Sequence, residues 1–407
     1  MSFQTGLSGL NASAKNLDVI GNNIANANTV GSKVSRTEFA SVVASAIGPS
    51  GGGGGSAGGG IGVEISTVSQ QFSQGTINIT GNNLDCAING GGFFQLTLKD
   101  GSTGFTRDGQ FKLDAKGNLI TNSGANVMGY TTDTAGNPTS TSLTNLVIPT
   151  GAPIAANATT AVTASFNLDA RAVVAASAVP PTPYTTYGTT MNGYDSQGVA
   201  VPIRLYFIKT ATDTWDVYDG DPAGTGVNLG TLGFDTSGNI LTPAPATLNA
   251  TLTSTNTNIG TFPITIDVSN ATQYGTAFAV SELTQDGYTA GTLTGVSISE
   301  QGVITTRYSN GQSQATGQIA LADFRNVQGL KPIGKGNWIE TPGSGQPIQG
   351  SPGQGNFGTI NSGALEASNI DLTAELVAMM TAQRDYQANA QTIKTQDTVL
   401  QTLVNLR

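Results

Sequence analysis

The sequence predicts a multidomain, mainly β protein that carries a helical domain built from its two termini. Three observations lead to this prediction. The last forty residues contain no Gly or Pro, and the first two dozen repeat apolar residues at helical spacing. The long interior has strand-like segments separated by Gly-rich turns. We expect the N- and C-terminal helices to pair as a coiled coil, beside a discontinuous inner β domain into which an outer β domain is inserted.

The domain boundaries follow changes in composition along the chain. The expected ranges, in chain order, are a terminal helical coiled-coil domain at 1–40 with 362–407, linkers at 41–70 and 345–361, an inner β domain at 71–145 with 285–344, and an inserted outer β domain at 146–284.

The C-terminal segment predicts one uninterrupted helix with an apolar seam. Apolar or small residues recur at alternating spacings of four and three, which is the pattern of a coiled coil. They are Leu372, Leu376, Met379, Tyr386, Ala390, Ile393, Leu400 and Val404, with Gln383 and Asp397 as interruptions. At about 1.5 Å per residue the helix is roughly 60 Å long, more than one small domain covers. We therefore expect it to need a partner.

A matching seam begins the chain. Its members are Phe3, Leu7, Leu10, Ala14, Leu17 and Ile24, broken only by Gly21. The helix is expected to end within 21–33, where the side chains of Asn22, Asn23, Asn26 and Asn28 suit hydrogen bonds to the backbone. Two arrangements fit the seams: a helical hairpin that closes one domain, or burial against neighbouring subunits. Two thin seams make a poor core, so we favour the second and expect the seam residues to form a polymer interface.

The composition excludes several classes of function. Only 11% of residues are charged, Gly numbers 54 and the net charge is -9, which suits turn-rich β structure and opposes nucleic-acid binding. The chain has no His, which excludes a Ser-His-Asp triad, a Cys-His pair and His-containing zinc sites. Cys86 is the single Cys, so no disulfide forms within the chain, and we expect it to be a small core residue rather than a reactive thiol.

No sorting or membrane signal is evident. The chain does not begin with a charged and then apolar signal peptide, and no run approaches eighteen apolar residues. We therefore expect neither membrane insertion nor the ordinary secretory signal.

Several interior motifs resemble ligand-binding loops, but their context favours plain loops and hairpins. The Gly-rich stretch 48–62 predicts a flexible loop, because a strand-like segment rather than a phosphate-binding helix follows it. Asp114 and Asp235 lie in the similar segments FKLDAKGNLIT and LGFDTSGNILT, which predict hairpins and lack the spaced oxygens of a calcium loop.

A further motif, GLKPIGK, matches a phosphate-binding loop as far as Lys335. Gly336 replaces the Ser or Thr that would bind magnesium, and Pro332 stiffens the segment, so a plain loop is favoured. No catalytic, cofactor-binding or metal-binding residue is expected.

The two ends of the chain carry a family resemblance. The start, SGLNASAKNLDVIGNNIANANTVGSK, and the end, SNIDL..EL..M...QRDYQANAQTIKTQD, resemble the signatures of the bacterial flagellar axial proteins, the rod and hook subunits. The interior segment GGGFFQL...GFTRDGQFKLDAKGNLITNSGANVMGY resembles the β domain of that family. One departure is Ser32, where many relatives place an aromatic residue. The signature positions are Asn22, Asn23, Asn26, Asn28, Gly31, Gln383, Arg384, Tyr386 and Asn389.

This resemblance implies a function. Rod subunits are commonly shorter and lack a large insert, so the length and the insert favour a hook subunit that self-assembles into a curved, flexible tube transmitting torque from rod to filament. Both termini would line the inner wall. The implied partners are other copies, the hook cap, the distal rod, the hook-filament junction proteins and the flagellar export apparatus, with an extracellular location.

Alternatives remain at this point. One is a distal rod or other axial protein. Two alternatives belong to other classes of protein. One is a β-rich secreted adhesin, and the other is a hydrolase that uses paired carboxylates, although the spacing of Asp and Glu residues selects no pair.

Overall fold

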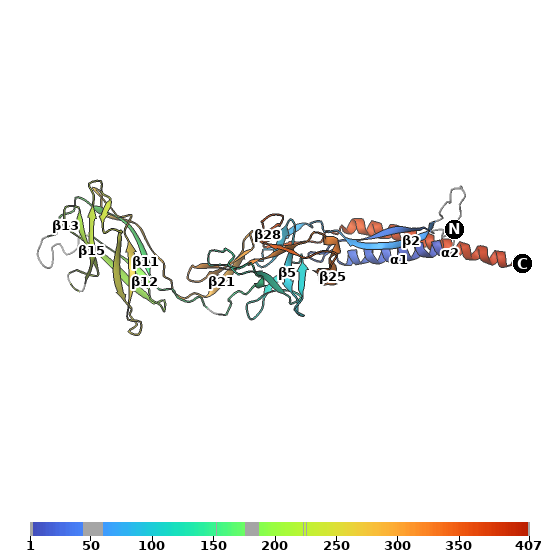
Figure 1. The fold of residues 1–407 in the computed structure, drawn as a ribbon, viewed down its shortest axis with the longest axis horizontal. Helices are drawn as coiled ribbons and strands as arrows, with labels where there is room; N and C mark the ends of the chain where they lie inside the picture. The colour runs from blue at the N-terminus through green and yellow to red at the C-terminus, as the bar shows by residue number, and fades with distance from the viewer. Residues whose placement is uncertain are drawn as a thin grey trace. The chain divides into compact units, whose positions relative to one another are not determined.

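The computed structural model describes residues 3–43, 60–151, 153–175, 187–222, 224 and 226–405, and the chain divides into two compact units (Figure 1). Unit 1 comprises Met1–Gly151, Gly295–Arg307 and Ser313–Arg407, and unit 2 comprises Ala152–Thr294 and Tyr308–Gln312. The insert that we expected at 146–284 overlaps this second unit over residues 152–284. Most of the Gly-rich stretch 48–62 lies outside the described residues.

Two terminal helices belong to unit 1, and they pack together as expected. The first is α1 (Phe3–Ala25) and the second is α2 (Leu372–Asn405), which run side by side in Figure 1. Asp371 caps α2, because its Oδ1 accepts hydrogen bonds from Thr373 N at 2.9 Å and Ala374 N at 3.2 Å. The fold class, mainly β with paired terminal helices, is confirmed.

A long hairpin packs against the helices. Strand β1 (Ser35–Val43) pairs antiparallel with β2 (Gly60–Gln70), and both strands contact α1. The range 41–70 therefore holds ordered strand residues where we expected only a linker. Residues 63–70 contain no Gly or Pro, and this strand-like segment after the Gly-rich stretch does form a strand.

The rest of unit 1 is β structure made from both sides of the insert. Its strands are β3 (Ile77–Ile79), β4 (Cys86–Asn89), β5 (Phe93–Thr97), β6 (Thr103–Thr106), β7 (Phe111–Leu113), β8 (Leu119–Thr121), β9 (Asn126–Tyr130), β10 (Thr144–Asn145), β21 (Leu293–Ile298), β22 (Val303–Tyr308), β23 (Ser313–Ile319), β24 (Leu321–Asp323), β25 (Lys331–Gly334), β26 (Asn337–Ile339), β27 (Ile348–Gly350), β28 (Thr359–Ser362) and β29 (Ala364–Glu366).

The two chain segments interleave strand by strand. In the largest sheet the order is β21-β22-β23-β9-β5-β6-β26-β25, so β5 and β6 lie between strands that come before and after the insert. Strand β27 pairs with β24, and β28 pairs with β4, so 345–361 also contributes paired strands rather than a linker. Each of these strands is only three or four residues long, too short for its alternation to be visible in the sequence.

An aromatic cluster fills the core beside these sheets. Phe93, Phe105, Phe324 and Trp338 are buried, and Phe72 packs on them from the segment after β2. Their rings meet edge to face at centroid distances of 4.8 to 6.1 Å.

Unit 2 is a β-sandwich. Its strands are β11 (Ala161–Asp169), β12 (Tyr187–Tyr194), β13 (Ala200–Ala211), β14 (Thr214–Asp219), β15 (Val227–Phe234), β16 (Ile240–Thr242), β17 (Thr247–Thr253), β18 (Thr261–Asp267), β19 (Thr272–Tyr274) and β20 (Ala279–Gln285). One sheet has the order β12-β13-β14-β15-β16, and the other joins β17, β18, β11, β19 and β20. The segment VPIRLYFIKTATDTWDVYDG forms β13 and β14, which pair antiparallel.

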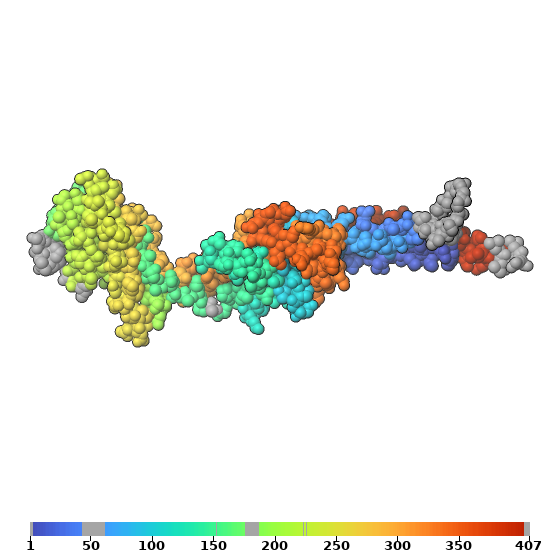
Figure 2. Space-filling view, viewed as in Figure 1, coloured from blue at the N-terminus to red at the C-terminus, as the bar shows by residue number. Residues whose placement is uncertain are grey.

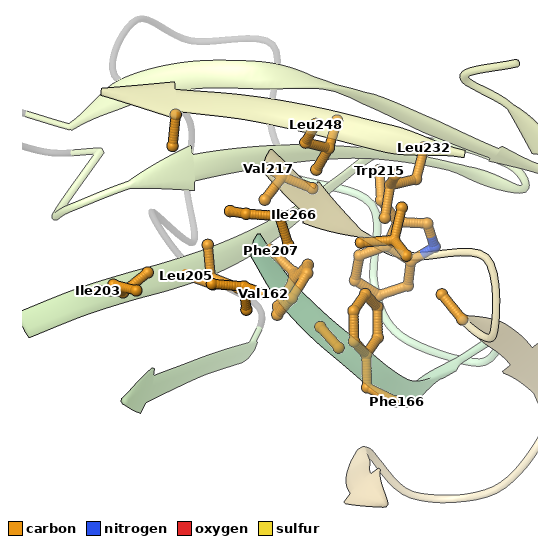
Figure 3. Packing of buried hydrophobic residues seen from close by; sticks show 14 of the residues in the cluster. Val162, Phe166, Ile203, Leu205, Phe207, Trp215, Val217, Leu232, Leu248 and Ile266 are labelled. Atoms are coloured by element: carbon orange, nitrogen blue, oxygen red, sulfur yellow. The ribbon is translucent and has the colours of Figure 1, made fainter. Parts of the chain in front are cut away.

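The core of unit 2 lies between these sheets. Buried side chains of both sheets converge there, as Figure 3 shows for Phe166 and Val162 of β11 with Phe207 and Trp215 of β13 and β14. The indole of Trp215 donates to Gln273 Oε1 at 2.9 Å, so its polar atom is satisfied inside the core. Every second residue of β11 and β17 is buried, which is the period of a strand with one covered face.

Candidate functional site

The helical part of unit 1 holds most of the residues singled out from the sequence. Its two helices run antiparallel: Gly6 lies beside Ile393 and Gly9 beside Asn389, whereas Asn23 and Ala378 line a common cavity. A Cβ placed on Gly6 would lie 3.0 Å from Ile393 Cγ1, and one on Gly9 would lie 2.9 Å from Asn389 Oδ1. The helices therefore approach each other where α1 has no side chain.

The predicted seam of α1 is not the surface that meets α2. Phe3 and Leu7 are 49% and 43% exposed. Leu10, Leu17 and Ile24 are half-buried, as is Ala14. The buried residues of α1 are Gly6, Ala12, Val19, Ile20 and Asn23. The closest contact of α1 with α2 therefore passes through Gly6 and Gly9, one position away from Leu7 and Leu10 of the predicted seam.

The seam of α2 divides between two faces. Met379, Ala390 and Ile393 are half-buried, and Ala382 is 3% exposed. Leu372, Leu376, Tyr386 and Leu400 are exposed, and the side chain of Val404 lies outside the described residues. Val377 and Met380, which the sequence analysis did not single out, are exposed as well. Ile393 and Asn389 contact the glycines of α1, so the predicted seam of α2 meets α1 only in part.

The end of α2 extends beyond α1. Because Ile393 already lies opposite Gly6, the turns that follow it have little of α1 beside them. In Figure 2 the red end of α2 stands clear of the blue helix and hairpin. Val399 and Leu400 on this extension are exposed.

The asparagines after α1 have distinct roles. Asn23 is buried, donates from Nδ2 to Ser35 O at 2.8 Å and accepts from Ser35 N at 3.0 Å, so it ties the helix to β1. Asn26 donates from Nδ2 to Asn22 O at 2.9 Å, which closes the turn. Asn22 and Asn28 are not buried.

Gly31 completes the turn at a position that no other residue fits. Its φ is +68°, and an added Cβ would lie 2.7 Å from the backbone of Arg107. In α2, Gln383 and Arg384 are exposed, and Asn389 Nδ2 donates to Ser13 Oγ at 3.3 Å. The signature residues are thus spread over a turn, a helix contact and an exposed face, and are not gathered in one pocket.

A buried ion cluster lies where both helices leave the β structure. Glu366, fully buried at the end of β29, accepts from Lys33 Nζ at 2.6 Å, Arg107 Nη1 at 3.1 Å and Gly75 N at 2.9 Å. Lys33 also donates to Ser73 O at 2.8 Å. Four chain segments meet at one carboxylate, so this cluster fixes the helical part on the inner β structure.

Electrostatics in the cluster depend on burial. Burial lowers the pKa of Lys33 and that of Arg107, and Glu366 opposes both shifts by attracting and hydrogen-bonding the cations. Arg107 also donates from Nη2 to Gly90 O at 2.9 Å, and its guanidinium lies 5.3 Å from the ring centroid of Phe93. Removing Glu366 would leave Lys33 and Arg107 buried without the carboxylate that pairs with both of them.

The sequence analysis did not single out this cluster. Lys33 and Glu366 lie 333 positions apart, and Arg107 and Glu366 lie 259 apart, so no local spacing links them. The available signal is compositional: in a chain with 11% charged residues, each charge that interrupts an apolar segment is a candidate for burial.

The ligand-like motifs have structural roles. Asp114 and Asp235 each accept backbone hydrogen bonds from residues two and four positions later, in hairpin turns. In the first of these, Gly117 has φ +84°, as such a turn requires. GLKPIGK forms part of the β25-β26 hairpin, and Cys86 is buried, with burial raising the pKa of its thiol to about 12.

The parts of the chain that the structure covers hold no cluster of metal-ligating side chains. Among those residues no three His, Cys, Asp or Glu side chains come together as metal ligands would. Within the same residues, neither helix has the length and hydrophobicity needed to span a bilayer. The features that remain are surfaces, and above all the uncovered apolar faces of α1 and α2.

Family models match the chain in four places. The model described as "Flagella basal body rod protein" matches 3–33, and "Flagellar hook protein FlgE/F/G D1 domain" matches 87–170. The model "Flagellar basal body protein FlaE D2 domain" matches 167–288, and "Flagellar basal body rod FlgEFG protein C-terminal" matches 361–406.

Individual proteins match over the whole length. The chain is 40% identical over 422 residues to the flagellar hook protein FlgE of Escherichia coli (strain K12), with 100% of both chains covered. It is 34% identical over 420 residues to that of Rhizobium meliloti (strain 1021), covering 100% of this chain and 98% of the relative. The crystal structure of Helicobacter pylori flagellar hook protein FlgE2 is similar in fold, with a TM-score of 0.54 and 18% identity over 71% of this chain and 100% of that one.

Proposed function

The chain belongs to the flagellar hook protein family, and on this premise we propose how its surfaces build a hook. It is a structural subunit of the bacterial flagellar hook, as the resemblance at both termini implied, and its place is in the hook outside the cell. Polymerisation with other copies of itself follows from membership in this family.

The observation that carries the proposal is the uncovered apolar surface of the terminal helices. Phe3 and Leu7 of α1, and Leu376 and Met380 of α2, are each between two-fifths and three-fifths exposed in the single chain. Covering a half-exposed side chain of this size contributes about 1 kcal/mol. The interface that we propose comprises the seam residues Phe3, Leu7, Leu10, Leu17, Ile24, Leu372, Leu376, Met379, Tyr386, Ile393, Leu400 and Val404, joined by Val377 and Met380.

We place these helices on the inner wall of the tube and unit 2 on its outer surface. In this arrangement the helices keep the tube closed, and the weakly charged Thr-rich strands of unit 2 exchange contacts as the curved hook turns. The ion cluster around Glu366 then joins the inner helices to the β structure that carries load outward.

The remaining partners follow by resemblance. We propose contacts with the hook cap, the distal rod and the hook-filament junction proteins, and export through the flagellum's own apparatus without a cleaved signal peptide. We also propose that the protein has no enzymatic activity. A distal rod protein or other axial subunit is not favoured by any particular contact.

Negative-stain electron microscopy of the concentrated full-length chain tests this function. We expect hollow tubes above a critical concentration and single subunits below it. The matched control is the same chain held dilute, with its mass checked by size-exclusion chromatography and light scattering. Single subunits at every concentration, or solid aggregates without a lumen, would contradict the proposal.

A further inference from the structure

A groove runs between the two helices and the β1-β2 hairpin. It has a volume of about 400 Å³ and is lined by Gly9 and Ala12 of α1, Phe39 and Val63 of the hairpin, and Asp385 and Ala388 of α2. Gly9, Ala12 and Ala388 are small, which leaves a hollow beside them, and Phe39 is exposed. The remaining lining is Ala382 and the polar residues Ser13, Asn16 and Asn389. Ala388 and Asp385 are exposed too, so the groove is open to solvent and carries one negative charge.

A ridge of larger side chains lies on another face of α2. Leu372, Leu376, Met380 and Arg384 follow at intervals of four residues, which aligns them on one helix face, and all four are exposed. This apolar strip ends in a positive charge. It points away from α1, because α2 meets α1 through Ala382, Asn389 and Ile393.

We propose that the strip of one subunit packs into the groove of a neighbouring subunit, with Arg384 facing the neighbour's Asp385. This inference deepens the proposed function and rests on it. Leucine and methionine side chains suit the apolar part of the groove, which glycine, alanine, phenylalanine and valine line, and the single charges are opposite in sign. Within the described residues, the ion pairs of this chain involve neither Arg384 nor Asp385.

The geometry of α2 makes this contact intermolecular. Adjacent helix residues point about 100° apart, so Arg384 and Asp385 of one chain do not face each other. Strip and groove are also different surfaces, so each subunit uses one toward one neighbour and the other toward the next. Such a head-to-tail contact either closes into a ring or continues as an open helix, which is the symmetry of a tube.

Charge exchange between subunits tests the pairing. Arg384→Glu alone places two carboxylates together and Asp385→Arg alone places two cations together, so each variant should raise the critical concentration for tubes at least about tenfold. An equimolar mixture of the two should restore assembly, because the carboxylate introduced in one variant then meets the guanidinium introduced in the other. The double variant R384E/D385R should also assemble. Lys112→Glu, an exposed charge reversal on β7, is the matched control.

A second variant fills the groove without altering charge. Ala388→Trp adds bulk at an exposed position, so it should leave the circular dichroism spectrum unchanged and raise the critical concentration. Wild-type tubes together with a mixture that fails to assemble would overturn the strip-and-groove pairing and leave the hook function standing. Absence of tubes from the wild-type chain would instead contradict the proposed function itself.

Discussion

Replacing Glu366 by Gln should destabilise unit 1 more than any single surface change. The carboxylate is fully buried, as is the Lys33 ammonium, and the Arg107 side chain is 6% exposed, so solvent screens these charges little. Removing one partner of such a buried cluster costs about 3 to 5 kcal/mol, because charge is left without compensation. For a unit of this size that corresponds to a fall in melting temperature of roughly 6 to 20 °C.

Differential scanning calorimetry checks this prediction, because we expect the two compact units to unfold in separate transitions. In Glu366→Gln the transition of unit 1 should fall and that of unit 2 should stay. Arg171→Ala, which removes an exposed ion pair of unit 2, should move neither transition measurably. Cys86 adds a second readout: it is buried in unit 1 with a raised pKa, so a thiol reagent should label it faster in the variant.

A triple replacement separates buried charge from simple packing. Exchanging Lys33, Arg107 and Glu366 together for apolar residues of similar size removes the uncompensated charge, so most of the lost stability should return. If Glu366→Gln shifts the unit 1 transition by less than about 2 °C, the carboxylate does not hold the two cations and the account of this cluster is wrong.

Three further predictions concern assembly, acid and the insert. Leu376→Asp should leave both calorimetric transitions in place and abolish tubes, because assembly would desolvate the new charge. Leu241→Asp, at an exposed position of unit 2, is the control and should assemble. Tubes from Leu376→Asp would refute the interface. Hydrogen bonds from Asn239 and Ser237 lower the pKa of Asp235, so its stabilisation is present above the unfolded pKa of about 4 and is lost as pH falls through the lower folded value. Asp235→Asn should therefore flatten the decline in the unit 2 melting temperature below about pH 4; an unchanged slope would contradict this. Deletion of 152–294 through a short Gly/Ser linker should still give tubes, straighter or stiffer than wild type, and a folded deletion variant that makes none would place unit 2 in the closing contact.

Sequence reasoning succeeded where a structure depends on local periodicity. The segments FKLDAKGNLIT and LGFDTSGNILT predicted hairpins, and both form, with Asp114 and Asp235 in their turns. A strand's period and a turn's hydrogen bonds are set by residues within a few positions. It also predicted that the termini are helical and packed together.

It failed where the answer depends on which surfaces meet. Large residues at heptad spacing gave the seam, but Gly6 and Gly9 allow a closer approach on another face, and periodicity alone does not rank these faces. Likewise, the partners of Glu366 lie in distant parts of the chain, and only the folded sheet brings Arg107 beside it. Only the three-dimensional structure therefore distinguishes the candidate interface from the contact within the chain.

The pairing of the first helix with the last requires nearly the whole chain to be present. Asn389 meets Ser13 across 376 positions, so this contact closes a loop that contains nearly the whole chain. A chain that arrives N-terminus first has its β units delivered before α2, and α1 has no partner until the final residues are present. The helix pair therefore forms only in a full-length chain. A chain truncated before α2 would still contain the residues of the β units but could not form the helix pair.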